Sequence, residues 1–157
     1  MEVDLSKKAT STEWIIGNIQ HAGFYRVNYD QENWKMLIKQ LNEDHKLIER
    51  INRAGLIDDA FNLGKAELIE QTVFFDVINY LTKEEDDLPF IPAFYGLNVI
   101  ADLLVENYQT YKLFQDYYKD LLEAVYKRIG FEDNLTNPNL LYNILFSPLF
   151  PLLIFSI

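Results

Sequence analysis

The sequence contains no cysteine and only two histidines, His21 and His45. Without cysteine the chain can form no disulfide and no metal site built on thiolates. A zinc site on a helix typically uses two histidines spaced i, i+4, so that both rings face one ion. Neither histidine has such a neighbour. We therefore expect two exposed loop histidines, with no metal and no other cofactor held by this chain.

Glycine and serine are scarce in the places where catalysis would use them. The six glycines are isolated from one another, so the sequence has no glycine-rich loop of the kind that binds phosphate. The serines occupy positions 6, 11, 147 and 156, outside the middle of the chain where helical patterns predominate. The sequence therefore offers no serine or cysteine in the setting of a catalytic nucleophile.

Basic residues are outnumbered by acidic ones. The chain has 14 Lys and Arg against 24 Asp and Glu, a formal net charge of −10. Affinity for nucleic acid comes largely from basic side chains that neutralise phosphates, so this balance argues against a nucleic-acid partner. The densest acidic run, residues 84–87, is expected to form a solvated loop.

Apolar side chains are abundant, at 49% hydrophobic and 15% aromatic residues, which suffices for one sizeable core. Residues 1–13 form a polar extension without the apolar stretch of a signal peptide. Residues 14–29 predict a β-hairpin, because Trp14–Ile16 is β-prone and the side chains of Phe24–Tyr29 alternate between two faces. Since an isolated hairpin is marginal in water, we expect these strands to be the last strands of a larger β-sandwich domain or to lean on the helices that follow.

Apolar residues at helical spacing dominate the chain from Asp30 onward. Asp30 is placed to cap a helix that carries Trp34, Leu37 and Leu41. Four further helices are predicted, over about 47–63, 68–81, from Pro92 past Leu104, and 108–129. The predicted fold is mainly α, an antiparallel helical array or stack of helix pairs over residues 30–133, preceded by the short β-hairpin.

The segment Ile51–Leu63 is expected to be the central helix. Its spacing predicts one buried face, formed by Leu47, Ile51, Ala54, Ile57, Phe61 and Gly64. Three charges interrupt this apolar segment, at Arg53, Asp58 and Asp59. Charged groups near a core are usually paired, because a buried ion without a partner costs several kcal/mol.

The two adjacent aspartates of this helix suit ion pairing better than catalysis. Neighbouring helical residues point about 100° apart, so Asp58 and Asp59 cannot share one substrate atom. We expect structural pairing with Arg53 or Arg26. The first choice for a structural ion pair is Arg53 with Asp59.

The end of the sequence, residues 134–157, differs from the rest. Residues 140–157 carry no charge and contain Pro148 and Pro151. Spanning a membrane takes about 20 apolar residues, and the prolines and the absence of a basic flank argue against a span. A buried segment or a foreign end is expected instead of a membrane anchor. Asn134 begins an Asn-Leu-Thr triplet, a possible glycosylation site that matters only if the chain is exported.

Several short motifs together resemble one enzyme family. They are Gly23–Asp30, Ile51–Ala54, Asp58–Leu63 and Leu88–Pro89, and they lie in order within about Trp14 to Phe131. This part of the chain resembles the aminopeptidase N type of zinc metallo-aminopeptidase, a gluzincin, most of all its membrane-bound members. The resemblance implies that residues 14–29 close a β-sandwich and that the following helices begin a bowl-shaped C-terminal domain. In such enzymes that domain covers the active site and limits substrate length.

The family's catalytic motifs are missing from this sequence. Neither the His-Glu-x-x-His zinc motif nor the Gly-x-Met-Glu-Asn segment that grips the peptide amino terminus occurs. The resemblance therefore implies zinc, a peptide substrate and a catalytic domain for the parent enzyme, and a place at the plasma membrane or the extracellular face. We expect this chain to be a non-catalytic fragment of such an enzyme. The alternative is a stand-alone helical module that binds a peptide or protein without catalysis.

Overall fold

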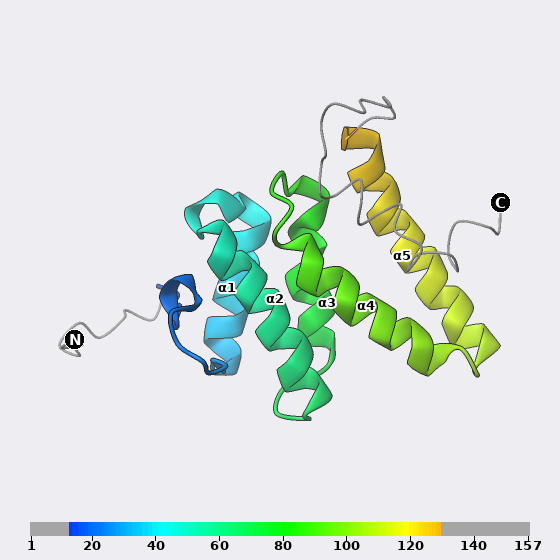
Figure 1. Ribbon diagram of the computed structural model, residues 1–157, viewed down its shortest axis with the longest axis horizontal. Helices are drawn as coiled ribbons and strands as arrows, with labels where there is room; N and C mark the ends of the chain where they lie inside the picture. Colours follow the sequence, from blue (N-terminus) through cyan, green and yellow to red (C-terminus); the bar gives the residue numbers. More distant parts are fainter. Residues whose placement is uncertain (1–12, 130–157) are drawn as a thin grey trace.

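The computed structural model describes the backbone of residues 13–129 and the side chains of 13–123 and 125. Its elements are η1 (Ile19–His21), α1 (Gln31–Asp44), η2 (His45–Leu47), α2 (Arg50–Lys65), α3 (Thr72–Ile78), η3 (Asn79–Lys83), α4 (Phe90–Leu104) and α5 (Tyr108–Ile129). The predicted helical array is confirmed, and α1 and α5 lie at its opposite ends (Figure 1). The tail 134–157 with Asn134, and nearly all of the extension 1–13, lie outside the described residues.

Helix α1 forms as the sequence predicts. The Asp30 side chain accepts a hydrogen bond from the backbone N–H of Asn33 at 2.8 Å, which satisfies one of the free donors of the first turn. Trp34, Leu37 and Leu41 are buried, at the i, i+3, i+7 spacing of one helix face. A local capping signal and an apolar stripe thus agree at this helix.

Helix α2 is the centre of the array. It packs against α3, α4 and η1, and ten of its residues are buried. The single buried face predicted for it is wrong at two positions, since Leu47 is 65% exposed and Ile51 37% exposed. Leu47 belongs to η2, before α2 begins, and a helix enclosed by several neighbours buries residues on more than one side.

The segment before α1 holds no strand within residues 13–29. Backbone groups of this segment form hydrogen bonds with side chains of the helices, where a strand would form them with a neighbouring strand. Asn33 bonds both the N–H and the C=O of Ile15, at 2.7 and 2.8 Å, and Asp59 accepts from the N–H of Val27 at 3.1 Å. A two-stranded hairpin is stable only when it joins a larger sheet or packs on other elements. The predicted hairpin and its place in a β-sandwich therefore stay predictions.

Helices α3 and α4 also differ from the predictions in their bounds. The third helix starts later, at Thr72, and its last turns tighten into η3, which ends at Lys83. Helix α4 starts at Phe90, so Pro92 lies inside the first turn and does not open the helix. Proline is tolerated there because the N–H groups of the first turn have no partner within the helix. The predicted bounds of α5 are confirmed.

Candidate functional site

The most deeply buried charges form a cluster around Arg53. Arg53 is 3% exposed and Glu84 is fully buried. Two parallel hydrogen bonds join them, from Nε to Oε2 at 2.7 Å and from Nη2 to Oε1 at 2.9 Å. Nη2 also donates to Asp86 Oδ2 at 2.7 Å, and Nη1 donates to the carbonyl of Ile48 at 2.6 Å. Such bidentate pairing is the strongest geometry an arginine can make with a carboxylate.

This cluster corrects two expectations. The run 84–87 is not a fully solvated loop, because Glu84 is enclosed and its Oε1 also accepts from the N–H groups of Glu85 and Asp86. Arg53 pairs with Glu84 and Asp86 and not with Asp59. Six positions apart on one helix, Arg53 and Asp59 point about 120° away from each other, so each meets a different neighbour.

The Arg53 side chain stays charged in this setting. Burial by itself lowers the pKa of Arg53, but the hydrogen bonds and charge of Glu84 outweigh burial and raise it. The Arg53 cluster, defined here as Arg53, Glu84 and Asp86, therefore holds the loop before α4 onto α2. That role is structural, because both oxygens of Glu84 are already occupied.

The aspartates of α2 are paired with Arg26, the other candidate partner. Arg26 Nη1 forms an ion pair with Asp58 Oδ2 and lies 3.3 Å from Asp59 Oδ1. Burial raises the pKa of Asp59, against the hydrogen bond from Val27 and the charge of Arg26. These contacts attach residues 26 and 27 to α2 and leave Asp58 and Asp59 in different hydrogen-bonding settings.

The two histidines are in contrasting places. His21 is exposed and its ring lies against Gly55, where an added Cβ would be 1.7 Å from Nε2. His45 was expected to be exposed but is buried, with its ring 5.5 Å from that of Tyr80 and its Nε2 3.8 Å from Glu84 Oε1. The Tyr80 ring of η3 and the Glu84 side chain lie against His45, which explains the difference. Burial lowers the pKa of His45, which the charge of Glu84 only partly opposes.

These donors do not fit the zinc site of a metallo-aminopeptidase. His45 has Glu84 as its nearby carboxylate, and Arg53 already takes both oxygens of that carboxylate. Within residues 13–129, no group of three or more His, Asp or Glu side chains could hold a metal ion.

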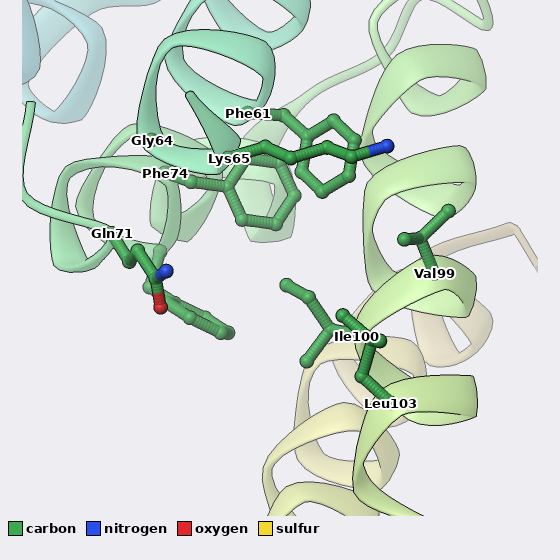
Figure 2. A pocket seen from close by; sticks show the side chains of 9 residues that line it. Phe61, Gly64, Lys65, Gln71, Phe74, Val99, Ile100 and Leu103 are labelled. Carbon is green, nitrogen blue, oxygen red and sulfur yellow. The ribbon is translucent and has the colours of Figure 1, made fainter. Parts of the chain in front are cut away.

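A pocket of about 230 Å³ opens between α4 and the ends of α2 and α3 (Figure 2). Its lining consists mostly of apolar side chains, namely Phe61, Phe74, Phe75, Val99, Ile100 and Leu103. Gly64, Lys65 and Gln71 complete it, so Lys65 is the one charged residue in the lining. Concave apolar sites with a few polar groups are typical of binding pockets.

One glycine shapes the aromatic wall of this pocket. The Phe61 and Phe74 rings meet edge to face with centroids 5.3 Å apart, against the backbone of α4 at Gly96. A Cβ at position 96 would lie 2.7 Å from Phe74 Cζ and 2.9 Å from Phe61 Cδ2. Only glycine leaves room for both rings at this crossing.

Sequence reasoning missed both the Arg53 cluster and the pocket. A signal existed for each. An arginine inside an apolar helix requires an acidic partner, and the run 84–87 is the densest supply of carboxylates in the chain. Helix α4 carries a second apolar stripe, Ile91, Tyr95, Val99 and Leu103, on a face whose one charged residue is Asp102.

Among the helices described in residues 13–129, none combines the length and the apolar character that a membrane span requires. The uncharged stretch 140–157, for which a buried segment or a foreign end is expected, is outside the described part of the chain. The buried or foreign character of that stretch stays a prediction.

Comparison with known proteins identifies the family. The sequence profile of the ERAP1-like C-terminal domain matches residues 14–148. The chain is 40% identical to the thyrotropin-releasing hormone-degrading ectoenzyme of Rattus norvegicus over 124 residues, 79% of this chain and 12% of that protein. It is 41% identical to aminopeptidase N of Plutella xylostella over 121 residues, and 34% identical to aminopeptidase N of Homo sapiens over 128 residues.

These matches cover most of this chain and a small part of each relative. The segment related to the Plutella xylostella protein is 77% of this chain and 13% of that relative, and the segment related to the human protein is 82% and 13%. The resemblance seen in the sequence motifs is thereby confirmed. This chain belongs to the ERAP1-like C-terminal domain family and is related over most of its length to aminopeptidases of the aminopeptidase N type.

Proposed function

We propose that this chain is part of the C-terminal helical domain of an aminopeptidase N-type zinc metallo-aminopeptidase, and that it contributes no catalytic or zinc-binding group. In the parent enzyme, which releases N-terminal amino acids from peptides, this domain covers the active site and shapes peptide access. The observation that carries the proposal is 41% identity to aminopeptidase N of Plutella xylostella over 77% of this chain.

The arrangement of charges in the described residues supports a structural role. The buried carboxylates of Glu84 and Asp59 are held by Arg53 and Arg26, and His45 is packed against Tyr80. A catalytic acid or base needs a free path to its substrate and hydrogen-bond reach of the reacting proton. Side chains held in this way stabilise a scaffold.

The proposed location is the plasma membrane or the extracellular face. One group of relatives is named as ectoenzymes, and this is the basis for the location. The proposed partners are the catalytic domain of the parent enzyme and its peptide substrate. Zinc is then bound by residues of the parent that are absent from this sequence.

A direct assay tests the catalytic half of the proposal. The full 157-residue chain is incubated with an amino-acid anilide and added zinc. We expect hydrolysis no faster than in buffer, because no group in residues 13–129 can hold the metal. Turnover that a chelator abolishes would overturn the proposal.

A chimera tests the role in substrate access. The matched segment of Plutella xylostella aminopeptidase N is replaced by the corresponding residues of this chain, and kcat/KM is measured for an anilide and for peptides of increasing length. We expect anilide hydrolysis close to that of the host, with a changed dependence on peptide length. A length dependence identical to that of the host, at unchanged anilide activity, contradicts a role in access.

The alternative, a stand-alone module that binds a peptide or protein, is favoured by one observation. The apolar pocket lies beside exposed side chains of α4, with Tyr95 58% and Leu103 76% exposed. The gene sequence upstream discriminates between the two functions. An in-frame zinc motif there supports the enzyme, and a complete short transcript supports the module.

A further inference from the structure

The pocket between α2, α3 and α4 combines an apolar lining with one positive charge. Its floor and walls are aromatic and aliphatic, and its volume is about 230 Å³. A pocket of this size suits a single ring or a short alkyl chain, and is too small for a folded partner.

Lys65 supplies the single charge of the lining. Figure 2 shows its side chain extending from α2 toward α4, with the ammonium group at the end nearer α4. Within residues 13–129, no carboxylate lies within ion-pair distance of Lys65. A cation beside an apolar wall is therefore available to an anion that brings its own apolar group.

We propose that this pocket binds a small monocarboxylic acid with an aryl or short alkyl group. The carboxylate pairs with Lys65, and the apolar group lies among Phe74, Phe75 and Ile100. This inference goes beyond the proposed function and does not depend on it, because it uses only residues of the pocket.

The lining also excludes related ligands. None of its nine residues is Asp or Glu, so the ammonium group of a free amino acid would have no anionic partner there. An apolar alcohol would fill the same space but would leave Lys65 without a counter-charge. The site therefore selects acids without an amino group over amino acids and over neutral analogues.

Calorimetric titration of the full chain tests the site with three matched probes. These are 4-phenylbutyrate, 4-phenylbutan-1-ol and phenylalanine. We expect 4-phenylbutyrate to bind about tenfold or more tightly than the alcohol, since a charge-assisted contact of about 1.4 kcal/mol corresponds to tenfold. Phenylalanine is expected to bind more weakly than 4-phenylbutyrate by a similar factor.

Two exposed positions provide variants that change the site without changing the core. Lys65→Met removes the charge, and we expect it to abolish the preference for acid over alcohol while leaving alcohol binding unchanged. Leu103→Glu, at the pocket and 76% exposed, introduces repulsion and should weaken only the acid. Leu103→Gln is the matched neutral control, and Lys112→Met on α5 is a control for loss of one charge far along the chain.

Three results would overturn the proposal. They are equal binding of acid and alcohol, acid binding that Lys65→Met leaves unchanged, and binding of phenylalanine as tight as that of 4-phenylbutyrate. Thermal melts of each variant establish that a loss of binding is not a loss of folding.

Discussion

A single buried ion pair, Arg53 with Glu84, holds the loop before α4 onto the central helix. Both partners are almost completely removed from water, which is costly, and their bidentate geometry compensates for that cost. Removing one partner leaves the other charge buried and alone. The stability of the array therefore depends on the pair more than on any charge at the surface.

Substitution Arg53→Ala is expected to lower the free energy of unfolding by about 3–5 kcal/mol, because Glu84 is left as an unpaired buried charge. Chemical denaturation followed by circular dichroism measures the change. Lys39→Ala is the control, since Lys39 and Glu43 form an exposed pair at 3.8 Å that should contribute less than about 1 kcal/mol. Equal effects of the two substitutions would contradict a dominant role for the buried pair.

His45 makes stability depend on pH in a defined direction. Burial holds the pKa of His45 below its ordinary value of 6.5, so the unfolded chain binds a proton before the folded chain does. The charges that act on it are those of Glu84, Arg53, Lys46 and Asp44, and the Tyr80 ring packs against it. Stability contributed by the neutral ring is complete above pH 6.5 and is lost as the pH falls through 6.5 toward the folded-state pKa.

The free energy of unfolding should therefore decrease between about pH 7.5 and 5, with a slope from this group of at most about 1.4 kcal/mol per pH unit. Denaturant titrations at several pH values measure the slope. His45→Gln should flatten it, and His21→Gln, which changes an exposed ring, should not. An identical slope for wild type and His45→Gln would refute this assignment.

At the scale of elements, α1 shows how one side chain fixes where a helix begins. Asp30 satisfies the Asn33 N–H, and its replacement by alanine leaves that donor without a partner in the first turn. Asp30→Ala is expected to cost about 1 kcal/mol in thermal or denaturant melts. Glu32→Ala, which removes an exposed carboxylate paired with Lys35 at the surface, should change stability by less. If Asp30→Ala leaves the stability unchanged, water replaces the hydrogen bond of the cap without a loss of free energy.

The crossing of α4 over α2 and α3 depends on Gly96. A larger side chain there would collide with the Phe61 and Phe74 rings, which cannot both move without disturbing the core. We expect Gly96→Val to destabilise the protein by about 1–3 kcal/mol through overpacking. Asn98→Val, two residues along the same helix and partly exposed, controls for the intrinsic helix propensity of valine. Equal stability of the two variants would show that the helices or the Phe61 and Phe74 rings shift to accommodate the larger side chain at no cost in stability.

At the scale of the whole molecule, the excess of acidic residues should make stability increase with salt. With a net charge of −10, the acidic residues repel one another. This repulsion destabilises the compact folded state more than the unfolded chain, in which the charges lie farther apart. Raising NaCl from about 0.01 M to about 1 M shortens the Debye length from about 30 Å to about 3 Å. We expect the melting temperature to rise over this range, and a fall would indicate that exposed ion pairs outweigh the net repulsion.

The fold class and most helix positions could be predicted because their signals are local. The Asp30 cap, the apolar spacing of Trp34, Leu37 and Leu41, and the full extent of α5 are all properties of short segments. The motifs between Gly23 and Leu63 likewise lie on contiguous residues, which is why the family could be predicted from the sequence. The expectations about ion-pair partners were weaker, because the partner of a charged residue can come from any part of the chain that folding brings close to it.

The sequence by itself determined that the chain is helical, that it lacks the family's zinc motif, and that the charges of α2 require partners. Only the tertiary structure decided which partners they have. Folding brings Glu84 next to Arg53, 31 positions away in the sequence, and buries His45 beside Glu84. It also pairs Asp59 with Arg26. The physical reason is that helix periodicity fixes the direction of a side chain, whereas the neighbour it meets depends on how whole helices and loops pack.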